Sequence, residues 1–369
     1  MQFQTSVSSA RSGNTQFDIR QTQGSTISNR TPHWSPSGQY IAFESTRSGN
    51  PDIWIMDADG SNPFNLTQWD ENANQSFSWS PDGRQIAFTS QWAGSFSSDI
   101  WLVNSDGTEP INLSAQLGLS DGYINCTPLW SPDGNSLAFF DDSPSKGDIK
   151  MVSLSSFDVT VLTGNLAQVD MEFTWSPDSQ RIAVSSLVGS EGFRPAIWMI
   201  DVESLNSRDI TISLQEQVGS EYTLKFIPYV DWSPTGSEIA FAVSYMGANL
   251  DIFVASTEGN GLTNLTSNLE GTSTYPVWSP DGSKIAFHSE HEGSFDVWVM
   301  DQDGANQMGL TSDNNTKEWF PAWSPDGKRI AFEMCYESCS FGGVNGPSDI
   351  WIMDADGSNK TNLTGQAPQ

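Results

Sequence analysis

The chain has 369 residues, a mass of 40.4 kDa and a formal net charge of −29, from 16 Lys and Arg against 45 Asp and Glu. A field of this sign repels phosphate groups, so the composition argues against nucleic acid and anionic membranes as partners. The chain contains 15 Trp and 20 Phe, enough large apolar side chains to build a core. It contains no run of about 18 apolar residues, the length a membrane-spanning helix would need.

A repeat organises the whole chain. The triplet Trp-Ser-Pro recurs at spacings of 45, 51, 45, 57, 46 and 45 residues, beginning at Trp34, Trp79, Trp130, Trp175, Trp232, Trp278 and Trp323. A period near 45 residues is typical of one four-stranded blade of a β-propeller.

Each unit predicts its strands in order. The first ends at the Trp, and the Ser-Pro-Asp-Gly that follows forms a tight turn, because Pro fixes φ, Asp caps the backbone and Gly tolerates positive φ. Ile-Ala-Phe is the second strand, Asp-Ile-Trp-Ile-Met-Asp the third and Phe-Asn-Leu-Thr the short outer strand. Both faces of the third strand are apolar and must be covered, as in sheets packed side by side around an axis.

The repeats leave the number of blades open between seven and eight. Residues 1–30 align with the last three strands of a unit but lack a Trp-Ser-Pro. We expect them to contribute edge or closure strands to a seven-bladed, all-β propeller of four-stranded antiparallel blades formed by residues 31–369. The alternative is eight blades, the number obtained by dividing the chain length by the commonest spacing.

These motifs resemble the PD40 (WD40-like) repeat of TolB-like propellers, which also occurs in the propeller domains of prolyl-oligopeptidase-type peptidases. The resemblance covers residues ~31–364 and implies a propeller fold. It does not extend to the additional α/β domain of TolB or to a peptidase domain, and no G-x-S-x-G motif for a nucleophilic serine is present. We therefore expect the propeller alone, with no catalytic residues.

Variable loops mark the expected binding face. Alternating strand direction places the Ser-Pro-Asp-Gly and Asp-Gly-Ser-Asn turns at one rim and the loops of variable length at the other. Aromatic and acidic residues gather in those loops and just before the inner strands. They would either grip a basic or neutral polar partner or plug the channel. The candidate partner-binding residues are Trp69, Asp70, Trp92, Tyr123, Glu172, Tyr229, Tyr275 and Trp319, of which Trp69, Trp92, Tyr123 and Trp319 are expected to be exposed.

Metal sites and cofactors are not expected. The Asp-x-Asp-Gly segments, such as Asp57 to Gly60, lack the downstream Glu of a calcium loop and are interpreted as hairpin turns. Calcium or another cation in the channel is the alternative. The Asp that opens the third strand in six units is interpreted as a structural acceptor. Cys335 and Cys339 are either a disulfide or two reduced thiols.

The sequence therefore favours a non-enzymatic binding or scaffold propeller that presents a loop-built face to a protein, peptide or glycan. One alternative is a metal-assisted polysaccharide lyase or hydrolase that uses His288, Glu290 and His291. Another is a structural domain cut from a larger cell-surface protein. The acidic, Lys-poor composition fits a periplasmic or extracellular location, and no signal peptide is visible in this numbering. The oligomeric state is not predicted.

Overall fold

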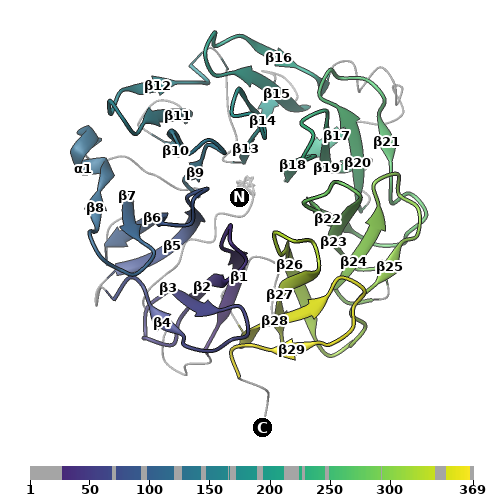
Figure 1. Cartoon of the computed structure of the whole chain (residues 1–369). Helices are drawn as coiled ribbons and strands as arrows, with labels where there is room; N and C mark the ends of the chain where they lie inside the picture. Colours follow the sequence, from purple (N-terminus) through teal and green to yellow (C-terminus); the bar gives the residue numbers. More distant parts are fainter. Residues whose placement is uncertain are drawn as a thin grey trace, which may run out of the picture.

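Seven sheets stand side by side in a ring around a central axis (Figure 1). The computed structural model describes residues 27–68, 72–92, 98–119, 127–142, 147–164, 166, 172–188, 194–211, 224–226, 229–245, 249–291, 293–336 and 346–365. Each sheet is antiparallel and built from strands consecutive in the chain, and we number the sheets as blades 1 to 7 in chain order. The prediction of a seven-bladed, all-β propeller is confirmed.

The elements follow the predicted order within each blade. Blade 1 contains β1 (Asn29–Trp34), β2 (Tyr40–Ser45), β3 (Asp52–Asp57) and β4 (Phe64–Asn65). Blade 2 contains β5 (Asn72–Trp79), β6 (Gln85–Trp92), β7 (Ser98–Asn104) and β8 (Ile111–Asn112), followed by the helix α1 (Leu113–Leu117). Blade 3 contains β9 (Leu129–Trp130), β10 (Ser136–Asp141), β11 (Asp148–Ser153) and β12 (Val159–Val161). Blade 4 contains β13 (Phe173–Trp175), β14 (Arg181–Val188), β15 (Arg194–Asp201) and β16 (Ser207–Asp209).

The remaining three blades repeat this plan, with an inner edge divided into two short strands in blade 5. Blade 5 contains β17 (Leu224–Phe226), β18 (Val230–Trp232), β19 (Glu238–Tyr245), β20 (Leu250–Ser256) and β21 (Thr263–Asn264). Blade 6 contains β22 (Ser273–Trp278), β23 (Lys284–Ser289), β24 (Asp296–Asp301) and β25 (Met308–Gly309). Blade 7 contains β26 (Lys317–Trp323), β27 (Arg329–Cys335), β28 (Ser348–Asp354) and β29 (Thr361–Asn362).

The hydrophobic core lies between the blades. Ile41, Ala42 and Phe43 of the second strand are completely buried, because both faces of the sheet are covered by neighbouring sheets. One core cluster, for example, joins Ala42 and Ile53 of blade 1 to Phe77 of blade 2. We call each such contact between neighbouring blades a seam.

The Trp of the repeated triplet joins each blade to the one before it. Its indole N–H donates to the backbone carbonyl that precedes the Trp of the previous blade, at 3.1–3.3 Å in five of the seams, through Trp34, Trp79, Trp175, Trp232 and Trp323. The Gly of the following turn has φ near +70° and packs on the Pro of the previous blade, as Gly83 does on Pro36. The triplet is therefore a device for stacking blades, which explains why it recurs.

The Asp that opens the third strand acts as the predicted acceptor. Asp52 accepts from Thr67 Oγ1 at 3.0 Å and from Asn65 Nδ2 at 2.8 Å, both on the outer strand. The same Thr-to-Asp bond occurs in blades 3, 5, 6 and 7. The interpretation of these acids as structural groups is confirmed.

The ring closes where blade 7 meets blade 1. Asn29 Nδ2 donates to Ser348 O at 3.0 Å and to Asp349 Oδ1 at 3.2 Å, and Ser28 forms a parallel bridge to Ser348. Because every described sheet takes its strands from one stretch of chain, the contacts that close the described ring run between sheets. The closure strands expected from residues 1–30 fall largely on residues 1–26, outside the described part of the chain.

Candidate functional site: an aromatic collar at the inner edge of the ring

A bulge interrupts the inner strand three residues before the Trp. Strand pairing shifts register at this point in β1, β5, β22 and β26. The residues there have left-handed φ values of 48°, 52°, 57° and 53° at Thr31, Ser76, Tyr275 and Phe320. This backbone is costly for non-glycine residues and re-aims the side chain relative to the strand. We call the seven residues at this position the collar: Thr31, Ser76, Thr127, Glu172, Tyr229, Tyr275 and Phe320.

The collar is aromatic along blades 5 to 7. The Tyr229 and Tyr275 rings lie 4.4 Å apart between centroids, and Tyr275 meets Phe320 edge-on at 5.0 Å. These three half-buried side chains come from successive blades, so they form a continuous arc at the inner edge of the ring. His288, completely buried, stacks against Tyr275 at 5.7 Å and supports the arc from behind.

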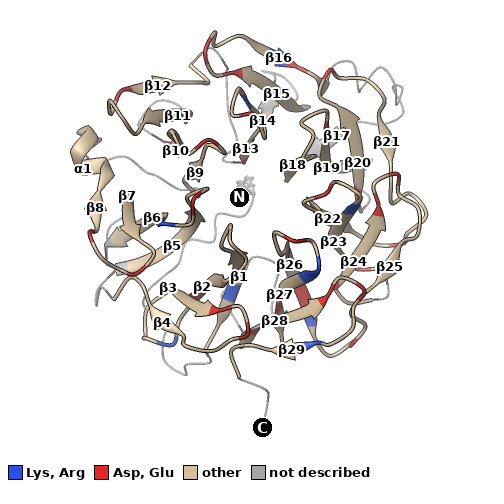
Figure 2. Cartoon of the chain, viewed as in Figure 1, with Lys and Arg blue, Asp and Glu red and all other residues tan. Residues whose placement is uncertain are grey.

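Acidic groups flank the aromatic arc. Glu172 occupies the neighbouring collar position in blade 4 and is exposed. Burial, and then the charge of Glu172, raise the pKa of the Tyr229 and Tyr275 hydroxyls above the ordinary tyrosine value. Burial also raises the pKa of Asp231, on β18, to about 7. Figure 2 shows the wider setting, with Asp and Glu distributed around the ring and Lys and Arg at a few separate places.

A buried ionic cluster supports the polar part of the collar. Glu44 Oε1 accepts from the backbone N–H of Ser76, a collar residue of the next blade, at 2.8 Å. Glu44 also pairs with Arg30 at 3.4 Å. Burial raises the pKa of Glu333 to about 7, and the charge of Arg30 opposes this shift. The sequence analysis missed this cluster, although its acids could have been noticed directly after Ile-Ala-Phe.

The structure brings together three of the predicted site residues. Glu172, Tyr229 and Tyr275 meet at the collar, as described above. Trp69, Asp70 and Tyr123 lie outside the described residues, as does the side chain of Trp92, the last residue of β6.

The expectation that Trp319 is exposed was wrong. Its side chain is 2% exposed and packs against Phe295 at 6.3 Å. Trp319 lies within β26, not in the loop before it, and the bulge that follows aims Phe320 toward the collar instead. The neighbour of the predicted residue is therefore the one that joins the aromatic arc.

The described residues gather no group of three or more His, Cys, Asp or Glu suited to a metal. His288 is enclosed by Tyr275, Phe295 and Phe320, whereas His291 Nδ1 contacts the backbone N–H of Glu270 at 2.9 Å. These two histidines and Glu290 therefore do not form the site that the lyase alternative needs. The Asp-x-Asp-Gly segments are hairpin turns, as predicted, in which Asp59 accepts from the backbone N–H of Ser61.

Two further observations concern the setting of the protein. Cys335 is disulfide-bonded, and its partner falls outside the described residues. No helix in the described part of the chain combines the length and apolar character needed to span a membrane.

Comparison with known proteins agrees with the fold. The profile described as "TolB beta propeller domain" (PD40) matches residues 15–166 and 168–341. A stretch of 44 residues is 43% identical to the Tol-Pal system protein TolB of Syntrophus aciditrophicus (strain SB). That alignment covers 12% of this chain and only 10% of the relative, so it carries no information about the relative's remaining length.

Solved structures of low identity share the propeller. The oligogalacturonate lyase of Vibrio parahaemolyticus has a TM-score of 0.64 at 14% identity, over 88% of this chain and 90% of that one. The propeller domain of the Trilobed protease from Pyrococcus furiosus, described as having an open velcro topology, has a TM-score of 0.65 at 12% identity, over 93% and 100%. These likenesses show the fold alone. The profile match over most of its length shows that the chain belongs to the TolB beta propeller domain family.

Proposed function

We propose that this propeller is a binding module that takes a basic side chain of a protein or peptide partner at its collar. The observation that carries the proposal is the aromatic arc of Tyr229, Tyr275 and Phe320 beside the exposed carboxylate of Glu172. An aromatic face attracts a cation by about 0.5–2 kcal/mol, and a neighbouring carboxylate adds to that attraction.

The charge of the chain supports a basic partner. A net charge of −29 steers cations toward the protein and raises their rate of encounter. Glycans also pack on aromatic rings, but an uncharged sugar would gain no charge–charge attraction from the carboxylate of Glu172. Arginine and lysine side chains use both the rings and the acid, and we therefore favour a polypeptide.

The enzyme alternative has less support. Oligogalacturonate, named in two of the structural neighbours, is polyanionic. The seven collar residues include no Lys or Arg to receive it. The donor set that a metal-assisted reaction would use is not gathered among the described residues.

An exported protein fits the same proposal. The disulfide at Cys335 is typical of oxidising compartments, and the acidic composition maintains solubility there. We therefore place this binding module in the periplasm or outside the cell.

The experiment selects peptides from a random phage-displayed library on the immobilised protein and measures synthetic copies by calorimetry. We expect Lys or Arg in the selected peptides and an affinity loss of about tenfold in Tyr275→Ala, because hot-spot aromatics cost at least about 1.4 kcal/mol when truncated. Tyr40→Ala is the matched control, since Tyr40 is 41% exposed at the start of β2, near the opposite rim.

Two results would contradict the proposal. One is a set of selected peptides without basic residues, and the other is equal affinity for wild type and Tyr275→Ala. A sugar array in which neutral glycans bind and basic peptides do not would favour the glycan alternative. Circular dichroism of each variant separates lost binding from lost folding.

A further inference from the structure

Two seams of the ring share a stacked arginine. Arg181, the first residue of β14, lies 5.3 Å over the ring of Trp232 in the next blade. Arg329, the first residue of β27, lies 4.8 Å over the ring of Trp34, again in the next blade. The backbone N–H of each arginine donates to the Ser of the preceding turn, at 2.9 Å in both cases. The 4–5 seam and the 7–1 seam therefore begin from the same geometry.

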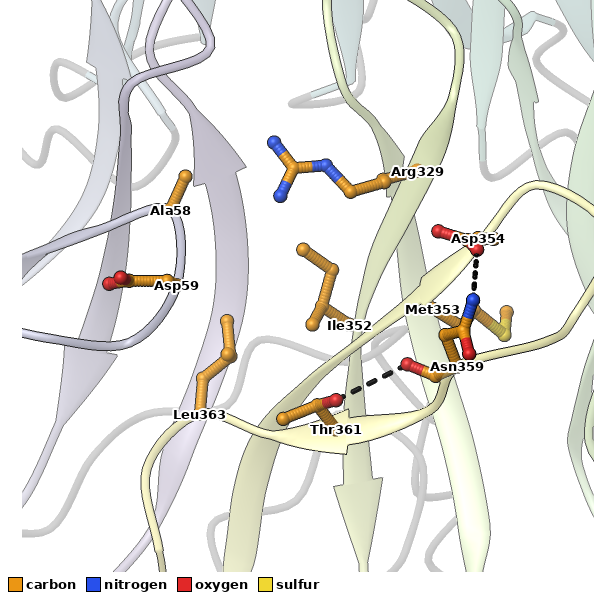
Figure 3. A pocket seen from close by; sticks show the side chains of 9 residues that line it. All are labelled: Ala58, Asp59, Arg329, Ile352, Met353, Asp354, Asn359, Thr361 and Leu363. Atoms are coloured by element: carbon orange, nitrogen blue, oxygen red, sulfur yellow. Dashed lines mark hydrogen bonds between the residues drawn. The ribbon is translucent and has the colours of Figure 1, made fainter.

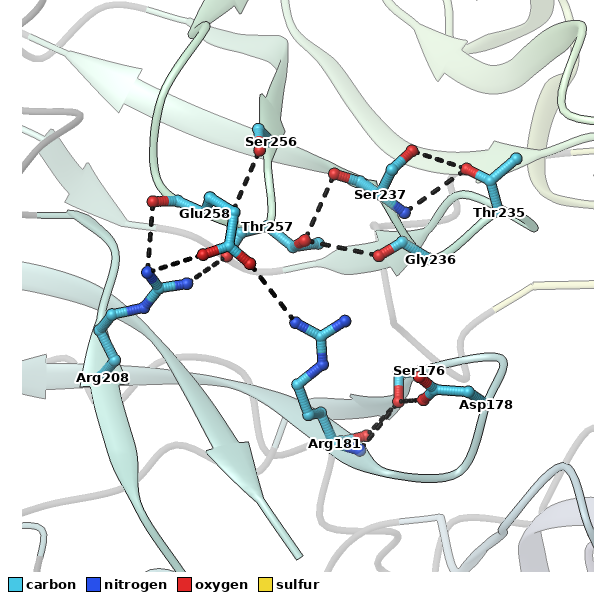
Figure 4. Close-up of polar contacts among 10 residues, drawn as sticks. All are labelled: Ser176, Asp178, Arg181, Arg208, Thr235, Gly236, Ser237, Ser256, Thr257 and Glu258. Carbon is cyan, nitrogen blue, oxygen red and sulfur yellow. Dashed lines mark hydrogen bonds and ion pairs between the residues drawn. The ribbon is translucent and has the colours of Figure 1, made fainter.

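The 4–5 seam is filled by a second arginine (Figure 4). Arg208, on β16, places Nη1 3.0 Å from Glu258 Oε2 and donates from Nη2 to Thr257 O at 2.8 Å. Arg181 reaches the other oxygen of Glu258 at 3.9 Å. The Glu258 carboxylate and the backbone carbonyls of Thr257 and Glu258, all in blade 5, thus receive two guanidinium groups from blade 4.

The 7–1 seam lacks the second arginine. In each of the two blades, a Thr after the outer strand accepts a hydrogen bond from the third strand: Thr211 in blade 4 and Thr364 in blade 7. Arg208 lies three residues before Thr211, and Thr361 lies three residues before Thr364. Thr361 is therefore the blade 7 residue equivalent to Arg208. Asp59 takes the place of Glu258, since each precedes the Gly that closes its turn, Gly60 and Gly259. A cavity of about 230 Å³ occupies this seam, lined by Arg329, Asp59, Asp354, Asn359, Thr361 and apolar neighbours, and Asn359 Nδ2 donates to Asp354 Oδ2 at 2.6 Å (Figure 3).

The charged residues that line the cavity have a net charge of −1, which favours binding of a cation. Asp59 and Asp354 carry two negative charges against the single positive charge of Arg329. Hydrogen bonds from Ser61 hold the pKa of Asp59 below its ordinary value, so Asp59 is ionised at neutral pH. Within the described part of the chain, the ion pairs shorter than 4.0 Å do not include Arg329.

We propose that the cavity in the 7–1 seam binds the guanidinium group of an arginine from a partner protein, in the place that Arg208 fills in the 4–5 seam. The guanidinium would pair with Asp59 and donate to the carbonyl of Ala58, the counterpart of Thr257. Its aliphatic stem would pack on Ile352 and Leu363, which line the same cavity.

This site is separate from the collar. Asp59 lies in the β3–β4 turn, and the backbone N–H of its neighbour Ala58 donates to Gln39 O in the β1–β2 turn at 2.9 Å. Both turns belong to the rim opposite the variable loops. The proposal therefore stands or falls independently of the collar.

The test measures binding of N-acetylarginine amide by saturation-transfer NMR, with N-acetylcitrulline amide as its neutral isostere and N-acetylglutamate amide as an anion. Every protein compared, including the reference called wild type here, carries Tyr275→Ala, so that the collar does not contribute to the signal. We expect the arginine probe alone to bind, with a Kd on the order of millimolar for one exposed ion pair. Thr361→Arg should weaken this binding by about tenfold or more, because its own guanidinium then fills the seam as Arg208 does. Asp59→Asn should weaken it by about threefold or more.

Matched controls carry the same changes elsewhere. Thr263→Arg adds an arginine to the outer strand of blade 5, at the position equivalent to Thr361. The 5–6 seam has no stacked arginine, because blade 5 has Glu238 at the position equivalent to Arg181. Asp106→Asn alters the corresponding turn of blade 2, where Asp106 accepts from Thr108. Both controls should bind the probe as wild type does.

Several outcomes overturn the proposal. It fails if the arginine probe does not bind wild type or if the citrulline probe binds equally well. It also fails if Thr361→Arg binds like wild type, or if the glutamate probe binds in preference, since Arg329 would then be the recognition group. Thr361 is exposed on a short outer strand, so its substitution should leave the fold intact, and a melting curve checks this.

Discussion

The residue five positions before the Trp contacts the Asp that opens the third strand of the previous blade. Asn74 Nδ2 donates to Asp52 Oδ1 at 2.9 Å, as Asn29 does to Asp349. Blade 7 has Glu318 at this position, facing Asp296. An ionised carboxylate cannot donate, so Glu318 has to carry a proton to make the equivalent bond.

The pKa of Glu318 should therefore control stability at alkaline pH. Burial, together with the nearby carboxyl of Asp296, raises this pKa to about 8. A raised carboxyl pKa means that the folded state holds the proton more tightly, so stability falls as the pH rises from about 4.5 through 8. In Glu318→Gln the amide donates at every pH. We expect its melting temperature to exceed that of wild type by about 4 °C or more at pH 9, and the two to converge below pH 5.

A control separates this effect from a general change in charge. Glu203→Gln removes one negative charge from an exposed site and should shift melting by the same small amount at each pH. Melting curves of Glu318→Gln and wild type that run parallel from pH 5 to pH 9 would show that Glu318 is ionised in the folded protein.

At the scale of an element, the turns between the third and outer strands differ in how closely the neighbouring blade approaches their glycine. Gly60 and Gly107 occupy the same place in blades 1 and 2, with φ values of 86° and 84°. A Cβ on Gly60 would lie 2.9 Å from the carbonyl oxygen of Leu363, in blade 7. A Cβ on Gly107 would lie 3.7 Å from Leu66 O, an ordinary contact.

Alanine at these two glycines should therefore differ in cost. Gly107→Ala should lower the free energy of unfolding by about 1 kcal/mol, because alanine disfavours the left-handed backbone. Gly60→Ala should have the same backbone effect and should also push apart the backbone of the 7–1 seam. This clash should lower the free energy of unfolding by a further amount of about 1–3 kcal/mol. Urea denaturation of both variants measures the difference. Equal free energies of unfolding would mean that blade 7 moves aside without cost.

The sequence predicts the blades better than the site, for a physical reason. Turn chemistry and alternating apolar residues are local, so Trp-Ser-Pro-Asp-Gly and Ile-Ala-Phe were enough to place the strands. The collar depends on a bulge, which changes the direction of one side chain. Because of this bulge Phe320, and not the predicted Trp319, joins the aromatic arc. It also depends on neighbours such as Tyr229 and Tyr275, which meet only when two blades pack together.

The 7–1 seam was beyond sequence reasoning for a similar reason. Asp59 and Thr361 come from opposite ends of the propeller, and neither is unusual within its own repeat. The 4–5 seam has Glu258 and Arg208 at the equivalent positions, and these two residues form an ion pair. Only this comparison shows that the position of Thr361 can hold an arginine. Repetition within the molecule thus supplies the reference that a single blade cannot.

At the scale of the whole molecule, the 7–1 seam differs from the other six in connectivity. The chain passes directly from one blade to the next at every other seam, so blades that separate there remain close together. Among the described residues, the chain joins blades 7 and 1 only through the rest of the ring. Once their packing is weakened, they have more freedom to separate, and the entropy gained on opening is larger.

Two buried isoleucines test this difference. Ile350 and Ile53 each follow the Asp of a third strand and are fully buried, Ile350 in the 7–1 seam and Ile53 in the 1–2 seam. Alanine at either position should cost about 2–5 kcal/mol by the same loss of packing. Hydrogen exchange followed by mass spectrometry should differ, with faster exchange confined to blades 7 and 1 in Ile350→Ala. In Ile53→Ala, exchange of blades 1 and 2 should follow global unfolding.

The comparison is meaningful only at matched global stability, so exchange is measured at urea concentrations that give the two variants equal free energies of unfolding. If both variants then open the same blades at the same rate, the connectivity of the seam has no energetic consequence and the ring behaves as seven equivalent contacts. If only Ile350→Ala opens locally, the 7–1 seam is the weak point of the ring. A guanidinium bound in its cavity would then join the two blades and slow their exchange, since a ligand that binds only the closed seam stabilises it.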